Sequence, residues 1–245
     1  MNNVIALLKS HRSIRKFSDR SVSQELIESL IESGQCAATS SFIQACTVIQ
    51  INDPKTRAQL RECAADQIYV SEAPVFLVFC ADMQRHRLAC DMHQAPMLFG
   101  YTEQFLTASI DCALFAQNVL IGAESVGLGG CYIGALRNNI AEVDYLLKLP
   151  ELVYPLFGLC LGYPAQDPEI KPRLPLPVVF KQDSYDDSTD KMHIEDYDRA
   201  VRAYYQTRTD GAIDHSWSEQ ISAMLAKEAR PHMLSYLQDK GFLLK

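Results

Sequence analysis

The sequence has 245 residues, 48% of them hydrophobic and 22% charged, which allows a sizeable buried core and excludes a disordered chain. Its formal net charge of -7 argues against nucleic acid as the main partner, because nucleic-acid binding needs a broad basic surface. No apolar run reaches the length that a bilayer requires, and residues 1–10 lack a signal-peptide core, so we expect a cytoplasmic protein without membrane contact.

Helix and strand patterns alternate through the first half of the chain. Apolar residues recur at helical spacing between Ser23, a suitable N-cap, and Gly34. The continuous apolar run Ala73–Cys80 indicates a strand covered on both faces. The longest helical pattern, Thr102–Val126, is apolar nearly all round and predicts a central buried helix. Other expected elements are helices at 3–8 and 53–63, a strand at 46–51, a loop of small residues at 37–44 and an irregular, mobile loop or lid at 90–101.

Glycines and prolines punctuate the second half. Gly127–Gly130 suits the end of the long helix, since glycine is common just past a helix C-terminus. Strands are expected at 131–133 and 153–161, with a helix at 138–147 between them. Five prolines follow Gly162 and favour an extended arm, with Val178–Phe180 as an edge or exchanged strand and helices at 194–207 and 217–239. The predicted class is α+β, with a core in residues 1–162 and an arm with C-terminal helices in residues 163–245.

A cationic segment lies near the start of this acidic chain. Residues 11–17, His-Arg-Ser-Ile-Arg-Lys-Phe, carry three firm positive charges, the Ser13 hydroxyl, and an apolar side from Ile14 and Phe17. Such donors on a short stretch suit a phosphate, because a guanidinium fork matches two phosphate oxygens. A basic turn after a surface helix explains the same residues, and the segment alone does not separate the two interpretations.

The sequence lacks the residues that dinucleotide binding, metal binding or hydrolysis would require. The glycines at 127, 129, 130 and 134 miss the dinucleotide-binding pattern, because position 132 is tyrosine and a helix precedes them. His86, Cys90 and His93 lie beside two arginines without a fourth ligand, so no metal site is predicted. No Gly-x-Ser-x-Gly elbow or Cys–His set indicates a hydrolase. The eight cysteines include no C-x-x-C pair and are predicted to be free, mostly buried thiols. The remaining cations, hydroxyls and glycines, distributed along the chain, suit the binding of an anionic cofactor that carries out the chemistry itself.

Three stretches, residues 11–17, 127–139 and 171–175, carry a family resemblance, with further motifs at 40–44, 67, 79–82, 116–118, 155–162 and 227–231. Together they resemble the nitroreductase–flavin reductase family, in the branch of the major oxygen-insensitive NADPH nitroreductases and NADPH–FMN oxidoreductases. The resemblance implies a nitroreductase-like fold, with a central, mostly antiparallel sheet flanked by helices around a long buried helix. It also implies a homodimer that exchanges the C-terminal arm, with FMN bound between the subunits by the 1–162 core and residues 163–245 completing the pocket.

The resemblance implies a role for each matching residue. Residues expected to contact FMN are His11, Arg12, Ser13, Arg15, Thr39, Ser40, Ser41, Gln67, Tyr69, Tyr132, Ile133, Gly134, Lys171 and Arg173. Two of these are expected to be catalytic: Arg15 near flavin N1 and O2, where a cation stabilises the charge gained on reduction, and the Gly134 N–H near N5. Ser40 and Ser41 also suit a cap on the segment that follows them, and Tyr69 suits a half-buried core position.

Substrate and NAD(P)H contacts are implied at Ser41, Phe42, Arg208, Lys227 and Arg230. Arg208 matches one basic residue at the adenine-side phosphate of NADPH, but residues 209–214 lack a second, so the preference between NADPH and NADH stays open. Ordinary surface charge explains Lys227 equally well. The predicted activity is two-electron, ping-pong reduction of small-molecule acceptors: nitroaromatics, quinones or free flavin. The alternatives are a non-catalytic FMN-binding or storage protein and a family member specialised for another flavin reaction.

Overall fold

The structure, a computed structural model, describes residues 2–245 and divides them into two compact units. The first unit comprises residues 2–167 together with Arg230–Lys245, and the second comprises Pro168–Ala229. The helices of the first unit are α1 (Asn3–Lys9), α2 (Gln24–Gln35), α3 (Pro54–Cys63), α4 (Tyr69–Glu72), α5 (Gln84–Met92), α6 (Thr102–Ser125), α7 (Ile140–Leu147) and α11 (Met233–Asp239), with 3-10 turns η1 (Ser40–Phe42) and η2 (Gly134–Asn139). The second unit contains α8 (Leu176–Val179), α9 (Asp190–Arg208) and α10 (Trp217–Leu225).

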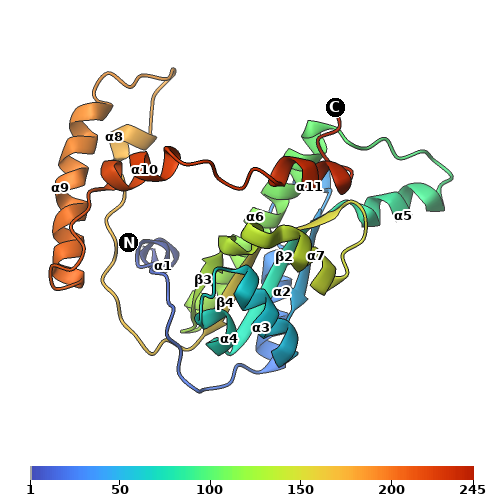
Figure 1. The fold of residues 1–245 in the computed structure, drawn as a ribbon, viewed down its shortest axis with the longest axis horizontal. Coiled ribbons are helices and arrows are strands. Elements are labelled where there is room, and N and C mark those ends of the chain that lie inside the picture. Colours follow the sequence, from blue (N-terminus) through green and yellow to red (C-terminus); the bar gives the residue numbers. More distant parts are fainter. Residues whose placement is uncertain (1) are drawn as a thin grey trace. The chain divides into compact units, whose positions relative to one another are not determined.

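A four-stranded antiparallel sheet forms the centre of the first unit (Figure 1). Its strands are β1 (Cys46–Gln50), β2 (Val75–Asp82), β3 (Gly129–Ile133) and β4 (Val153–Gly162), in the order β1-β2-β4-β3. Strand β2 pairs with β4 from Val75–Leu161 to Asp82–Val153. The predicted α+β class and the antiparallel sheet are confirmed.

Helices cover both faces of this sheet, which explains the continuous apolar run in β2. On one face, α2 and α6 pack on alternate strand residues such as Leu77, Phe79 and Leu159. On the other face, side chains of α3, α4 and α7 pack around Phe76 and Val78. Every β2 residue is buried, as expected for a strand covered on both sides.

The long helix α6 is only half covered within the chain. Residues such as Ala108, Cys112 and Ala116 are buried. Leu106, Ile110 and Leu114, at i, i+4 and i+8, form an exposed apolar stripe, with 46%, 54% and 44% of their surface exposed. The expectation of a helix buried all round is therefore wrong for the single chain, because the sheet covers only one of its faces.

Helix α6 also corrects the statement that no apolar run could cross a bilayer. Its 24 residues include a stretch of mean hydropathy 1.4, which meets the length and composition of a membrane span. A core helix of a globular domain meets the same test. The residues that α6 buries contact the sheet and its neighbouring helices.

The predicted helix ends follow their capping residues. The Ser23 hydroxyl accepts from the Leu26 N–H at 3.3 Å, and Asp53 accepts from the Thr56 N–H at 2.8 Å. Gly127, with φ +83°, follows the end of α6, and the Leu128 N–H donates to the Ala123 carbonyl. These three predictions are confirmed.

Three segments differ from the predicted elements. The strand expected at Val178–Phe180 is wrong: residues 176–179 form α8, because a proline in the first helical turn suits a helix start. The single helix expected at 217–239 is wrong, because Arg230 (φ +52°) and Pro231 lie between α10 and α11. The irregular loop begins at 93, since α5 continues to Met92. Six of the eight cysteines are buried as expected, whereas Cys36 is exposed and Cys90 half-buried.

The C-terminal residues return to the first unit through α11. The Tyr236 hydroxyl donates to Asp144 Oδ2 at 2.6 Å, and Lys240 Nζ lies 2.8 Å from the same oxygen. Phe242 is buried edge-on against Tyr154, with ring centroids 4.9 Å apart. Burial and the neighbouring Asp144 carboxylate raise the pKa of Tyr236. These contacts attach α11 to α7 and β4.

Replacing Tyr236 with Phe is expected to destabilise the protein by about 1–2 kcal/mol near neutral pH, because Asp144 loses a donor. The raised pKa means that folding favours the neutral phenol, so this stabilisation is present below the unfolded pKa of about 10 and is lost as pH rises above it. Urea unfolding across this range should therefore show the difference between wild type and Y236F shrinking at high pH. Tyr145→Phe, at an exposed position, is the control, and a pH-independent difference would contradict the assignment.

Candidate functional site

The basic segment lies against the β3–β4 end of the sheet. The Ile14 N–H donates to the Gly130 carbonyl at 2.9 Å, and the Ile14 side chain is buried. Phe17 forms an isolated bridge with Pro164, and the Ala165 N–H donates to the Lys16 carbonyl. The apolar side of the segment is thus anchored, while Arg15 and Lys16 are exposed and Ser13 is half-buried.

Arg15 lies near two elements of the first unit. Its guanidinium acts electrostatically on the Tyr69 hydroxyl of α4 and on Cys131 of β3. Burial raises the pKa of Tyr69, with Arg15 opposing that rise, so the hydroxyl is neutral near pH 7 and leaves the guanidinium charge uncompensated. Within residues 2–245, no carboxylate forms an ion pair with Arg15. Gln67, half-buried, lies just before α4.

His11 and Arg12, in contrast, are paired with acids of the chain. His11 Nδ1 lies 2.5 Å from Glu124 Oε1 of α6, and Arg12 Nη2 lies 2.8 Å from Asp167 Oδ1. Both acids line an open cavity of about 220 Å³, together with Arg12 and Gly129. An anion bound at this position would therefore have to exchange partners with Glu124 or Asp167.

The β3 residues alternate between the faces of the sheet. Cys131 and Ile133 pack in the cluster formed with α3, α4 and α7. Tyr132 points to the opposite face, where its ring meets Phe157 edge-on at 5.1 Å. The Tyr132 side chain is therefore not brought together with Arg15 and Tyr69, which lie on the Cys131 side. Gly134 follows at the start of η2, so only the backbone of 132–134 is shared between the two faces.

Two arginines near Gly134 form a group that the sequence analysis only half identified. A Cβ at Gly134 would lie 3.2 Å from Arg137 Nη2. Arg230 donates to Asn138 at 2.9 Å, and burial followed by the charge of Arg230 lowers the pKa of Arg137. Arg137 lies in the 127–139 stretch that carries the family resemblance, which implied no role for it. Its position three residues after Gly134 is the signal that could have assigned it, since a 3-10 turn eclipses residues i and i+3.

The loop 39–45 is held in a strained conformation. Ser41, Phe42 and Gln44 have left-handed φ values of 49°, 57° and 55°, each costing of the order of 1–3 kcal/mol for a non-glycine residue. Asp111 of α6 accepts from the Ser40 and Ala45 N–H groups, and His86 Nε2 lies 2.6 Å from the Ile43 carbonyl oxygen. Phe42 is 79% exposed as a result. No hydrogen bond or ion pair in residues 2–245 joins this loop to the Arg15 group.

In the second unit, tyrosines of α9 contact the segment that carries the predicted phosphate cations. Lys171 Nζ donates to the Tyr205 hydroxyl at 2.6 Å, and the Tyr197 hydroxyl donates to the Pro172 carbonyl at 2.9 Å. Burial raises the pKa of Tyr197, and the charge of Arg173 opposes this rise. Lys171 and Arg173 thus resemble Arg15: each cation lies near a tyrosine, and neither forms an ion pair within the described residues.

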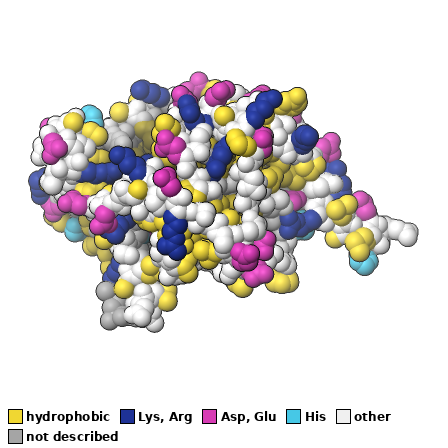
Figure 2. All heavy atoms as spheres, turned by 90° about the horizontal axis from the view of Figure 1, so that it is seen from below, with side chains coloured by type: hydrophobic (Ala, Val, Ile, Leu, Met, Phe, Trp, Pro, Cys, Tyr) yellow, Lys and Arg dark blue, Asp and Glu magenta, His cyan; other side chains and the backbone are white. Residues whose placement is uncertain are grey.

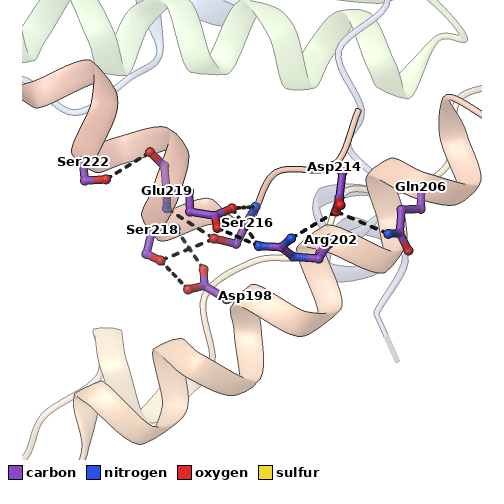
Figure 3. A network of polar contacts seen from close by, with 8 residues as sticks. All are labelled: Asp198, Arg202, Gln206, Asp214, Ser216, Ser218, Glu219 and Ser222. Carbon is purple, nitrogen blue, oxygen red and sulfur yellow. Dashed lines mark hydrogen bonds and ion pairs between the residues drawn. The ribbon is translucent and has the colours of Figure 1, made fainter. Parts of the chain in front are cut away.

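Arg208, at the end of the same helix, donates to the Tyr204 hydroxyl at 3.0 Å. The loop that follows is fixed by the polar network in Figure 3. In it, Arg202 donates to both Glu219 oxygens at 2.8 Å and to Asp214 at 3.2 Å. Asp198 accepts from the N–H and hydroxyl of Ser218. The loop that follows Arg208 is therefore ordered, and it carries acidic residues. Lys227 lies after the end of α10 and is exposed.

The lysines and arginines described above can bind an anion. Their surroundings do not resemble a metal centre. Within residues 2–245, no three His, Cys, Asp or Glu side chains converge as metal ligands would. Lys and Arg side chains lie interspersed with Asp and Glu on the face drawn in Figure 2, without one continuous basic area. The fold and the cations define an α+β protein suited to a small anionic ligand.

Comparison with known proteins narrows this class. Sequence models match the chain for the "Nitroreductase family" over residues 8–163 and for the "Nitroreductase family, C-terminal domain" over residues 171–245. The chain is 44% identical to an NADPH-flavin oxidoreductase of Vibrio harveyi over 98% of both sequences. It is 43% identical to an oxygen-insensitive NADPH nitroreductase of Salmonella typhimurium over 99% of both. The solved structure of a Vibrio harveyi NADPH:FMN oxidoreductase complexed with NAD+ has a TM-score of 0.91 and 41% identity, covering 100% of both chains.

The chain therefore belongs to the nitroreductase family. The branch expected from its motifs is confirmed by these matches along nearly its whole length.

Proposed function

We propose that the protein is an FMN-dependent NAD(P)H oxidoreductase that transfers two electrons to nitroaromatics, quinones or free flavin. The observation that carries this proposal is the Arg15 guanidinium, which lies near Tyr69 and strand β3 and is paired with no carboxylate in residues 2–245. The names of the relatives support NAD(P)H-dependent flavin chemistry. We propose FMN in particular, and not a flavin without a phosphate, because a phosphate group requires cations in addition to the one beside the flavin ring.

The residues present fit FMN in their donor chemistry. Arg15, Lys171 and Arg173 offer charge that no acid of the described chain neutralises, which suits a phosphate or a reduced ring. The Thr39 hydroxyl oxygen is buried without a hydrogen-bond partner among the described residues, and Ser40 and Ser41 follow it, which suits a hydroxyl-rich ribityl chain. When bound, FMN accepts a hydride and passes two electrons on.

Each side chain then has a defined task. His11, Arg12, Ser13, Lys171 and Arg173 bind the phosphate, and Thr39, Ser40, Ser41, Gln67 and Tyr69 contact the ribityl chain and ring. Arg15 stabilises negative charge at N1 and O2, and the Gly134 N–H donates toward N5. The backbone of Tyr132 and Ile133 lines the ring. Arg137, against Gly134, adds a further cation at that end.

The proposed assembly is a homodimer. The apolar stripe Leu106, Ile110 and Leu114 on α6 is exposed in the single chain, and burying it against a second copy removes that surface from water. The loop 39–45 has no hydrogen bond to the Arg15 group in the described chain, which supports a site completed by the partner subunit. The proposed location is the cytoplasm, which suits six buried free thiols.

The nucleotide and the acceptor share the pocket, with Ser41, Phe42, Lys227 and Arg230 at its mouth. Arg208 is the proposed contact to the NADPH adenine-side phosphate. Asp210 and Asp214 follow it, and acids oppose an added phosphate, so NADH use is part of the proposal. A storage role is not favoured, because the relatives are named as oxidoreductases.

The test is anaerobic reduction of the purified protein, reconstituted with FMN, by NADPH and by NADH in turn. Bleaching of the flavin absorbance, followed by its return when a quinone or nitroaromatic is added, is the expected result, with parallel double-reciprocal plots. The preference for one nucleotide over the other should not exceed about 10²-fold in the rate of reduction, since a single arginine supplies about 1.5–3 kcal/mol at most. A protein that does not retain FMN contradicts the proposal; one that retains it without turnover supports storage.

A further inference from the structure

The loop 39–45 is closed at both ends by one side chain. Asp111 Oδ1 accepts from the Ser40 N–H and Oδ2 from the Ala45 N–H, each at 3.2 Å. Between these two hydrogen bonds lie the left-handed residues Ser41, Phe42 and Gln44. A single carboxylate of α6 therefore spans the segment that presents Phe42 to solvent.

Asp111 is an unusual residue for its position. It is 1% exposed, next to Cys112 and near Ala108 on the mostly apolar buried face of α6. A buried carboxylate is costly unless it is hydrogen-bonded, and the donors here are backbone N–H groups of the loop. Within the described residues no cation forms an ion pair with Asp111. Packing in the core would be more favourable with an apolar residue at this position. The carboxylate is therefore explained by its hydrogen bonds to the loop.

We propose that Asp111 is a positioning residue, which fixes the loop 39–45 in the conformation that presents Thr39, Ser41 and Phe42 to the cofactor and acceptor. This inference rests on the proposed function, since it assigns those residues to the pocket. A carboxylate can accept at both ends of the loop, whereas an amide offers one acceptor oxygen and one donor group. Asp111 therefore holds a conformation that the left-handed residues would leave if either end were released.

Helix α5 holds the same loop from outside the core. His86 Nε2 lies 2.6 Å from the Ile43 carbonyl oxygen, and Arg85 donates to the Gln44 carbonyl at 3.4 Å. Arg85 is in turn paired with Asp82 at 3.0 Å. These tethers act on carbonyls and Asp111 on N–H groups, so the two can be removed separately. His86→Ala loosens the loop without changing α6.

The experiment compares Asp111→Asn with Asp144→Asn, a matching carboxylate to amide change at a half-buried position of the first unit that lies outside the proposed pocket. Hydrogen exchange measured by mass spectrometry on peptides covering 39–46 reads the loop directly, with or without FMN. We expect at least tenfold faster exchange in this peptide in D111N, a smaller increase in His86→Ala, and none in D144N. Peptides from β2 and α6 report whether each variant is folded.

Activity then separates positioning from a structural role. In FMN-loaded D111N the KM values for NAD(P)H and for a quinone acceptor, which share Ser41 and Phe42, should each rise about tenfold, while kcat stays within about threefold. Unchanged loop exchange in D111N overturns the proposal whatever His86→Ala shows, as does faster exchange in D111N with unaltered KM values. Should wild type fail to bind FMN, the proposed function and the pocket assignment fail together, and the exchange data then separately decide whether Asp111 orders the loop.

Discussion

Arg15→Gln and Arg173→Gln, introduced together, are expected to weaken FMN binding by about 10²–10⁴-fold. Each removes a charge-assisted donor worth about 1.5–3 kcal/mol, and glutamine keeps much of the side-chain length. The sum of about 3–6 kcal/mol converts to this range of dissociation constants. Since neither cation forms an ion pair within residues 2–245, their removal leaves no acid unpaired, and the loss is in ligand binding.

The measurement is quenching of FMN fluorescence during titration of the apoprotein. The matched control is Arg61→Gln with Arg199→Gln, which removes the same charge from one surface ion pair in each unit, with Asp66 and Asp196. Surface pairs of this kind contribute little, so the control should bind FMN as wild type does. Retention of FMN by the Arg15 and Arg173 double variant would show that the site lies elsewhere.

Gly130→Ala is expected to destabilise the protein by about 3 kcal/mol. A Cβ at this position would lie 2.5 Å from the Cys160 carbonyl oxygen and 2.7 Å from Leu161 Cδ2. The carbonyl belongs to the β3–β4 pairing and cannot withdraw without breaking it, so the added methyl group displaces β3. Because β3 leads into Gly134, flavin binding should weaken as well.

The comparison is Gly127→Ala, which has no atom within 4 Å of the new Cβ but a φ of +83°. Here only backbone strain opposes alanine, at about 1 kcal/mol. Thermal unfolding should place the melting temperature of G130A about 6–12 °C below that of wild type, and G127A much closer to it. The reverse order would mean that β3 can shift away from β4.

Local patterns predicted most of the secondary structure, because those patterns record local physics. Ser23 and Asp53 satisfy the first N–H groups of their helices, and Gly127 adopts a conformation that other residues avoid. The apolar run of β2 could be assigned to a doubly covered strand for the same reason. The family motifs then carried the resemblance that the comparisons confirmed.

Predictions failed where distant residues decide the outcome. Val178 lies in a short helix, although its β-branched, proline-flanked neighbourhood favoured a strand. The exposed stripe of α6 could not be foreseen, because composition gives apolar content and not which side the sheet covers. Strand alternation places the side chains of Tyr132 and Ile133 on opposite faces of the sheet, so the expected contact of both residues with one ring stays a prediction about their backbone.

By itself, the sequence determined the class of fold, the family and the kind of ligand, because caps, apolar periodicity and clustered cations are properties of neighbouring residues. Only the tertiary structure decided which cations are already paired: His11 and Arg12 meet Glu124 and Asp167, whereas Arg15 forms no ion pair within residues 2–245. It also brought Asp111 to both ends of a loop some 70 residues earlier in the chain. Charge compensation and hydrogen bonding depend on the distance between two groups in space. Folding sets this distance, and the number of residues between the groups does not.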